Sequence, residues 1–80
     1  MTRDLVISTP RYEQKLHLTA RGHETIGDIA GVAAEFWGYP KERFTLQGEN
    51  LVPLDERLLI RDAQIKDRDE LELVITAGAV

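Results

Sequence analysis

One stretch of helical periodicity, lying between regions that alternate like strands, most limits what this chain can fold into. Thr25 followed by Asp28 gives an N-cap with a carboxylate at the third helical position, close to a capping box. Gly38 suits the left-handed residue that ends a helix, and Pro40 prevents the helix from resuming. Between these signals the apolar residues form one stripe at helical spacing: Ile26, Ile29, Ala30, Ala33, Phe36 and Trp37. The pattern predicts one amphipathic helix that must bury one face.

Alternating residues before this helix predict two strands. Residues 15–20 place Leu16, Leu18 and Ala20 on one face, with the period of two of a half-buried strand. Residues 4–8 alternate in the same way, and Pro10 ends that segment. The two segments predict a hairpin with a loop of about five residues.

The second half of the chain predicts further strands and a charged loop. Residues 43–47 alternate and are followed by a turn at 48–50, after which residues 51–52 form a very short strand. Residues 55–70 are charged and indicate a loop with one helical turn. Residues 71–75 alternate again and form the last strand. Since the first and last strands are rich in Leu and Ile, pairing them in the middle of the sheet would bury both.

One amphipathic helix on one apolar sheet face predicts a two-layer α+β domain. Gly27 and Gly31 lie inside the helix, where each costs about 1 kcal/mol relative to Ala, and close packing on the sheet is the simplest reason for them. We expect Phe36 in the core and Trp37 partly exposed, as an interface anchor. The predicted core consists of Leu5, Ile7, Leu16, Leu18, Ile26, Ile29, Ala33, Phe44, Leu46, Ile65, Leu71 and Leu73.

Composition argues against several classes of protein. The 80 residues suffice for one domain, and the absence of Cys excludes disulfides and thiolate sites. His17 and His23 are isolated, no metal-binding spacing is present, and no cofactor is expected. The net charge of −4 gives no basic footprint for nucleic acid. No apolar run approaches the roughly 20 residues of a membrane span, and the N-terminus lacks a signal-peptide core. We expect a soluble cytoplasmic protein that is not an enzyme.

Four segments, taken in order, resemble ubiquitin and its relatives, the β-grasp proteins. They are "TARGHETIGDIA" before and into the helix, "GYP" at its exit, "FTLQGENL" at the next strand and turn, and "LLIRDAQIKDRDELELVI" at the end. The resemblance implies a mixed sheet of four to five strands packed on one helix, in the order ββαββ, with a short helical turn before the last strand. It also implies a ubiquitin-like domain at residues 1–75 and a flexible tail at 76–80.

The C-terminal tail has two possible interpretations under this resemblance, as the processed end of a protein modifier or as an ordinary terminus. Conjugated family members end in two glycines, because a chain without Cβ atoms can pass through a narrow enzyme channel. This chain ends Gly78-Ala79-Val80. In one interpretation it is a precursor, and a protease removes the last two residues to expose Gly78 after Thr76 and Ala77. In the other, Gly78 belongs to an ordinary frayed terminus.

The resemblance also indicates a partner-binding surface on the open sheet face beside the tail. The positions that match ubiquitin's apolar patch are Thr45, Glu72 and Val74, with Gln47 and Gly48 next to them. Of the three matched positions, only Val74 is apolar. Standard ubiquitin readers are therefore not expected to bind, and the alternative interpretation is an ordinary solvated sheet face.

Three functional hypotheses follow from the resemblance. The first is a bacterial-type protein modifier, activated by an E1-like enzyme after processing by a protease. The second is a non-conjugated adaptor or accessory subunit, similar to the small ubiquitin-like proteins of type VII secretion systems. The third, less favoured because the terminal Gly-Gly is missing, is a sulfur carrier. All three act through protein partners.

Overall fold

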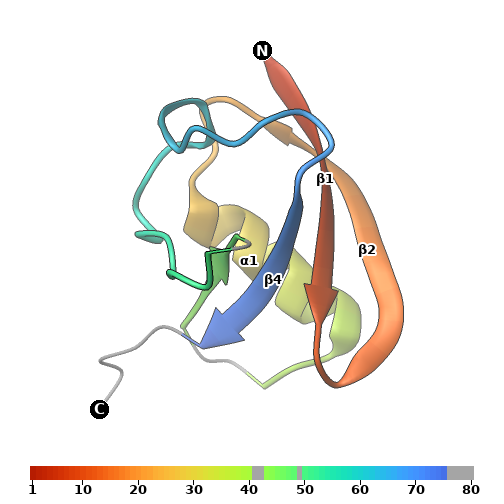
Figure 1. Ribbon diagram of the computed structural model, residues 1–80. Helices are drawn as coiled ribbons and strands as arrows, with labels where there is room; N and C mark the ends of the chain where they lie inside the picture. Colours follow the sequence, from red (N-terminus) through yellow and green to blue (C-terminus); the bar gives the residue numbers. More distant parts are fainter. Residues whose placement is uncertain (41–42, 49, 76–80) are drawn as a thin grey trace.

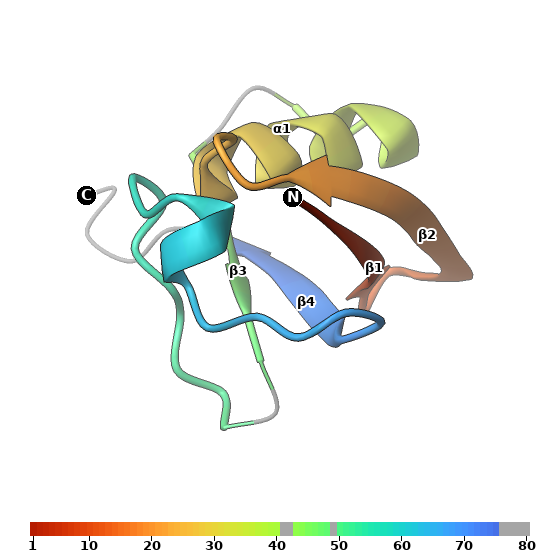
Figure 2. The same ribbon diagram turned by 90° about the horizontal axis from the view of Figure 1, so that it is seen from above.

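A computed structural model describes residues 1–40, 43–48 and 50–75, and shows a sheet covered on one face by a single helix (Figures 1 and 2). The elements, in chain order, are β1 (Thr2–Thr9), β2 (Tyr12–Arg21), α1 (Ile26–Trp37), β3 (Phe44–Gln47), the 3₁₀ helix η1 (Ile60–Asp62) and β4 (Glu70–Ile75). The predicted α+β class and ββαββ order, with a helical turn before the last strand, are confirmed. The proposed tail at 76–80 lies outside the described residues.

Within the described residues, the sheet has four strands in the order β2-β1-β4-β3. β1 pairs in parallel with β4, while β2 and β3 pair antiparallel with their neighbours. The first and last strands therefore lie in the middle of the sheet, as their apolar content predicts. Because β1 and β4 are parallel, the turn after β1 lies at the same end of the sheet as the end of β4.

The ends of α1 follow the signals in the sequence. The Thr25 hydroxyl accepts a hydrogen bond from the Asp28 main-chain N–H (3.0 Å), and the Asp28 carboxylate accepts one from the Thr25 N–H (3.1 Å). This reciprocal capping box satisfies two N–H groups that the first helical turn leaves free. Gly38 ends the helix with φ 70°, a conformation that glycine adopts without steric cost.

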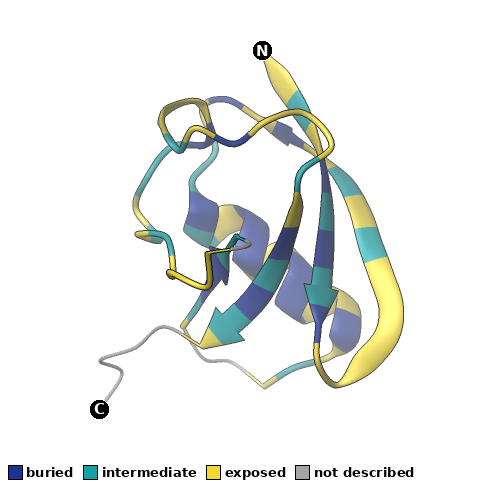
Figure 3. Cartoon of the chain, in the orientation of Figure 1, coloured by how far each residue is buried: buried dark blue, intermediate teal, exposed yellow. Residues whose placement is uncertain are grey.

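The core lies between α1 and the sheet (Figure 3). Nine of the twelve residues predicted for it are buried, while Leu16, Leu18 and Phe44 are only partly buried against it. These three lie on β2 and β3, the two edge strands, where the cover of the single helix ends. The buried side chains form one cluster: Leu5, Ile7, Ala20, Ile26, Ile29, Ala30, Ala33, Ala34, Trp37, Leu46, Ile60, Ile65, Leu71 and Leu73.

The prediction for the two aromatic residues at the end of α1 is wrong. Trp37 is only 9% exposed, and its indole N–H donates to the Gln14 carbonyl at 3.2 Å, whereas Phe36 is 45% exposed. The reason is helical geometry at about 100° per residue. Trp37 follows Ile26 by three complete turns plus about 20°, so both face the sheet. Phe36 is rotated about 100° from Trp37, onto the flank.

Three further predictions also need correction. The β1–β2 hairpin turns through Pro10 and Arg11 alone, because Thr9 pairs with Tyr12. Residues 51–52 form no strand, and an isolated bridge joins Gln47 to Pro53 instead. Gly27 packs against a loop and not against the sheet, and a Cβ at Gly31 would have no other segment within 4 Å. The Gly27 N–H donates to the Glu56 carbonyl at 2.8 Å, and a Cβ at Gly27 would lie 3.0 Å from that oxygen.

Candidate protein-interaction surface

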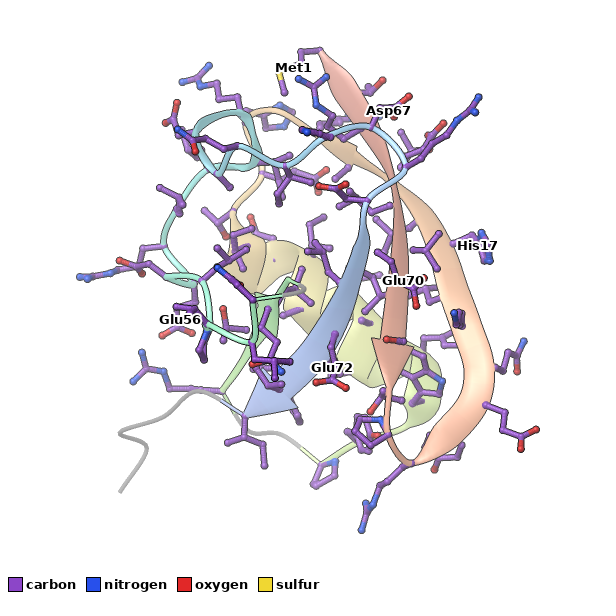
Figure 4. The ribbon with its side chains drawn as sticks, viewed as in Figure 1. Met1, His17, Glu56, Asp67, Glu70 and Glu72 are labelled. Carbon is purple, nitrogen blue, oxygen red and sulfur yellow. The ribbon has the colours of Figure 1, made fainter. Side chains whose placement is uncertain are left out.

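The sheet face opposite α1 carries most of the predicted partner-binding residues. Antiparallel pairing sets Thr45 opposite Val74 and Gln47 opposite Glu72. The Gln47 side-chain amide donates to Oε1 of Glu72 at 2.7 Å. We call this side of the sheet the outer face. Figure 4 shows Glu70 and Glu72 along β4 on this side.

The outer face is polar because its side chains pair with one another. Lys15 of β2 reaches across β1 and forms an ion pair with Glu70 of β4 at 2.8 Å. The Thr19 hydroxyl donates to the Asp4 carboxylate at 2.8 Å. Cross-strand pairs of this kind stabilise a sheet modestly and leave few unpaired groups to offer a partner. These pairs give the outer face polar contacts of its own across all three strand pairings.

Thr45 does not belong to the exposed part of this surface. Its side chain is 1% exposed, and its hydroxyl donates to the Leu54 carbonyl at 2.6 Å. The Leu54 N–H donates in turn to the Leu46 carbonyl at 2.8 Å. The chain after the turn at Gly48 thus lies along the free edge of β3 and covers Thr45. The alternation of residues 43–47 correctly predicted that Thr45 points away from the helix. It could not predict that the chain around Leu54 covers this side chain.

Two apolar side chains at the margin of the outer face were not predicted as site residues. Leu51 is 70% exposed and Val52 is 57% exposed. Leu51 has φ 59°, a left-handed conformation that is costly for a branched residue, and its N–H donates to the Gly48 carbonyl. With Gly48 and Glu72 it lines an open hollow of about 330 Å³. Apolar contact beside this face is therefore available from the loop and not from Thr45.

A second exposed apolar surface surrounds the end of β4. Ile75 is 57% exposed and lines a hollow of about 500 Å³ with Pro10, Arg11, Tyr39 and other residues. The Arg11 guanidinium lies 5.9 Å from the centre of the Tyr39 ring, in cation–π geometry. We call these residues, Pro10, Arg11, Tyr39 and Ile75, the tail-base surface. No sequence signal marks it, since only the parallel pairing of β1 with β4 brings its parts together.

Thr76, Ala77 and Gly78, the predicted conjugation residues, lie outside the described part of the chain. Trp37, predicted as an interface anchor, is in the core, and its flank neighbour Phe36 is the exposed aromatic residue. Gln47, Glu72 and Val74 lie on the outer face as partly buried residues.

The titratable groups of the described residues do not form a cluster for metal binding, since no three His, Asp or Glu side chains are grouped suitably. Asp67 and Asp69 instead accept hydrogen bonds from the main-chain N–H groups of Asp4 and Lys66, respectively.

The main-chain N–H of Arg57, and then its guanidinium, hold the pKa of Asp55 below its ordinary range. Within the part of the chain that the structure describes, no helix is long and apolar enough to cross a bilayer.

This chain is similar to known proteins in its three-dimensional structure, but no similarity was found in sequence searches. No protein-family model matches this chain, and no curated protein matches it in sequence. Among solved structures it is similar to the ubiquitin of Caldiarchaeum subterraneum, with a TM-score of 0.80 and 16% identity over 98% of this chain and 99% of that one.

Two further solved structures cover nearly whole chains. One, described as "Molecular Mimicry of SUMO promotes DNA repair", has a TM-score of 0.79, 19% identity and coverage of 92% of this chain and 91% of that one. The other is a chain of a toluene 4-monooxygenase HD complex, with a TM-score of 0.82, 5% identity and coverage of 95% and 100%. Proteins of different roles thus share this architecture. The chain has the ubiquitin-like β-grasp fold.

Proposed function

We propose that this chain is a ubiquitin-like protein that acts through protein–protein contacts and has no catalytic chemistry of its own. We further propose that it is the precursor of a bacterial-type protein modifier. A protease removes Ala79 and Val80, and an E1-like enzyme then joins the Gly78 carboxylate to the AMP part of ATP, releasing pyrophosphate. The observation that supports this role is the exposed tail-base surface from which the tail departs.

The length of the tail explains why that surface matters. Thr76, Ala77 and Gly78 reach about 10 Å when fully extended. An enzyme that acts on Gly78 must therefore approach the body of the domain and contact the tail-base surface. Ile75 and Pro10 offer apolar area there, and Arg11 offers a positive charge that an acidic enzyme surface would attract.

The experiment uses a chain that ends at Gly78, incubated with ATP and the E1-like enzyme encoded in the same genome. We expect an acyl-adenylate that is detectable by mass spectrometry. Gly78→Asp should abolish the adenylate without changing the melting temperature. Arg11→Glu should lower the rate of its formation. Arg61→Glu, an exposed charge reversal on η1, serves as the matched control. The proposal fails if no adenylate forms and protein from the native host retains Ala79 and Val80.

An adaptor role is the second candidate, and one observation favours it. Leu51 and Val52 present exposed apolar side chains next to the polar outer face, where no tail chemistry is involved. Apolar anchors surrounded by polar groups are typical of protein-binding surfaces. In this case Leu51→Ser with Val52→Ser should abolish capture of the partner from host extract, while truncation after Ile75 leaves it intact. A secretion ATPase gene beside this one would favour the adaptor. Genes for an adenylating enzyme and a metalloprotease would favour the modifier.

A further inference from the structure

The free edge of β2 presents main-chain groups to solvent. β2 is the outermost strand and pairs only with β1 among the described residues. The Val6 N–H donates to the Asp69 carbonyl at 3.0 Å, so the main chain of Val6 faces β4. Since successive residues of a strand point their N–H and C=O groups to opposite sides, Leu5 and Ile7 bond toward β2.

The register then identifies the unpaired groups. Leu5 and Ile7 lie opposite Leu18 and Leu16, so those two residues of β2 bond inward. The N–H and C=O groups of Lys15, His17 and Thr19 point away from the sheet.

The row of free groups ends at Arg21. The Arg21 N–H donates to the Glu24 carboxylate at 2.7 Å, and the Arg21 carbonyl accepts from the Glu24 N–H at 3.0 Å. Three consecutive outward-bonding residues, centred on His17, are thus available for pairing. Figure 4 shows His17 projecting from β2 beyond the outline of the sheet.

Apolar side chains lie beside this edge on the helix side. Leu16 and Leu18 are only partly buried, and Val32 and Phe36 of α1 are 52% and 45% exposed. Val32 and Phe36 lie one turn apart, on the flank of α1 opposite Ala34. Because Ala34 lines a groove with Phe44 of β3, the flank of Val32 and Phe36 faces β2. A strand added at β2 would cover these four side chains.

The protection that exposed strands usually have is confined to the turn end of this edge. Natural edge strands are commonly guarded by charged side chains, especially Lys, by a proline or by a bulge. Lys15 is paired with Glu70 at 2.8 Å, and the residues from Leu16 to Ala20 include no Asp, Glu, Lys or Arg. The irregular register of β2 lies between Tyr12 and Leu16, at its turn end, and includes Glu13 and Lys15. The segment from Leu16 to Ala20 is therefore regular and open.

Its sequence is complementary to itself in antiparallel orientation. If two copies of β2 pair about a two-fold axis at His17, Leu16 lies opposite Leu18 of the other copy. Continuing the same residue count toward Tyr12 sets Lys15 opposite Thr19 and Glu13 opposite Arg21, twice by symmetry. Glu13 and Arg21 are both exposed. This register also sets outward-bonding residues against outward-bonding residues, as the main-chain hydrogen bonds require.

We propose that β2 is the association surface for a second copy of this chain, joining two sheets into one continuous sheet. The two copies of Leu16, Leu18, Val32 and Phe36 then meet on one side of it, between the helices. Two Glu13–Arg21 ion pairs fix the register. This inference rests on β2 and is independent of the tail chemistry proposed above.

Charge exchange in the full chain tests the proposal directly. Sedimentation equilibrium over a wide concentration range should show a dimer for the natural sequence. Glu13→Arg alone, or Arg21→Glu alone, sets like charges opposite each other at both ends of the interface. We expect the dimer dissociation constant to rise roughly tenfold or more for each. An equimolar mixture of the two variants should recover association as a heterodimer, because each like pair becomes an opposite pair.

A second pair of variants tests the main-chain bonds. Thr19→Pro removes an outward N–H that the monomer does not use, and proline is tolerated on an edge strand. Thr19→Ala is the control, since it loses the same hydroxyl contact with Asp4 but keeps the N–H. Only Thr19→Pro should abolish the dimer, with both variants folded by circular dichroism.

The amide protons of His17 and Thr19 should exchange more slowly with solvent as the concentration of the natural sequence increases. A chain that stays monomeric at millimolar concentration overturns the proposal and leaves the edge to an extended peptide of another protein. A dimer that survives both Glu13→Arg and Thr19→Pro overturns it also, because association then uses another face.

Discussion

The side-chain amide of Gln47 donates a 2.7 Å hydrogen bond to the carboxylate of Glu72, directly across the pairing of β3 with β4. The resemblance in sequence matches Glu72 to a position in the apolar patch of ubiquitin, so we expect this bond to change how a partner could bind there. It ties both polar groups to each other on the β3 side of the outer face. A protein partner that covers this hydrogen bond must either form hydrogen bonds with Gln47 and Glu72 or remove both side chains from water without replacing their contacts with it.

The first prediction is that ordinary ubiquitin-binding domains do not bind this chain measurably. Loss of an apolar anchor from the centre of an interface commonly costs about 2 kcal/mol or more. A titration followed by amide chemical shifts should show no change at Glu72 and Val74 at concentrations where ubiquitin itself is saturated. Saturable shifts at these residues would contradict the prediction.

The second prediction concerns the buried hydroxyl of Thr45. Thr45→Val keeps the shape of the side chain but leaves the Leu54 carbonyl without its 2.6 Å donor. We expect a loss of about 1–3 kcal/mol in the free energy of unfolding, measured by denaturant melts. Thr19→Val is the matched control. The Thr19 hydroxyl donates at 2.8 Å from an exposed position, where water can replace it. Equal losses for the two variants would show that Thr45 is not covered.

The third prediction compares two residues of β4. Leu73 is 3% exposed in the core, whereas Ile75 is 57% exposed at the strand end. Leu73→Ala should cost about 2–5 kcal/mol because it leaves a cavity. Ile75→Ala should cost less than about 1 kcal/mol, since little area is removed from water there. A Leu73→Ala cost below about half a kcal/mol would mean that β4 is not central.

The fourth prediction separates the adjacent aromatic residues of α1. Trp37→Ala should destabilise the fold by about 3–5 kcal/mol, since the ring is buried and its N–H bonds to Gln14. Phe36→Ala should change stability by less than about 1.5 kcal/mol, the range expected for an edge-to-face ring contact with Trp37. Thermal unfolding of both variants provides the comparison, and a reversed order would place Phe36 in the core after all.

The fifth prediction follows the ionisation of Asp55. The Arg57 main-chain N–H donates to the carboxylate at 2.9 Å, and the guanidinium adds further hydrogen bonds, so the pKa of Asp55 is lowered. A lowered carboxyl pKa gives stability that is present above the unfolded pKa of about 3.9 and is lost as pH falls through the folded pKa. Since Asp55 is exposed, the contribution is small.

Carboxyl titration by NMR checks this directly. Arg57→Ala should raise the pKa of Asp55 only part of the way to its ordinary value, because the main-chain N–H remains. Arg61→Ala, which removes an exposed arginine from η1, should leave it unchanged. An unchanged value in Arg57→Ala would show that the guanidinium contributes nothing.

The amino-acid sequence by itself determined the local elements and, through the resemblance, their assembly. The capping box of Thr25 with Asp28 and the left-handed Gly38 are interactions within a few residues, so their pattern is complete in the sequence. The alternation of β4 likewise fixed which side chains face the helix. The burial of Trp37 could also have been predicted from helical angles of about 100° per residue, but Phe36 was expected in the core instead.

Only the tertiary structure decided which of the remaining surface is covered. Thr45 is buried because the chain around Leu54 lies against the edge of β3, and that loop has no periodicity from which its path could be predicted. The tail-base surface exists because parallel pairing brings Arg11 beside Ile75, residues 64 positions apart in sequence. The open edge of β2 follows from its place in the strand order. Burial between distant segments depends on packing in three dimensions, and a local pattern records only the direction of each side chain.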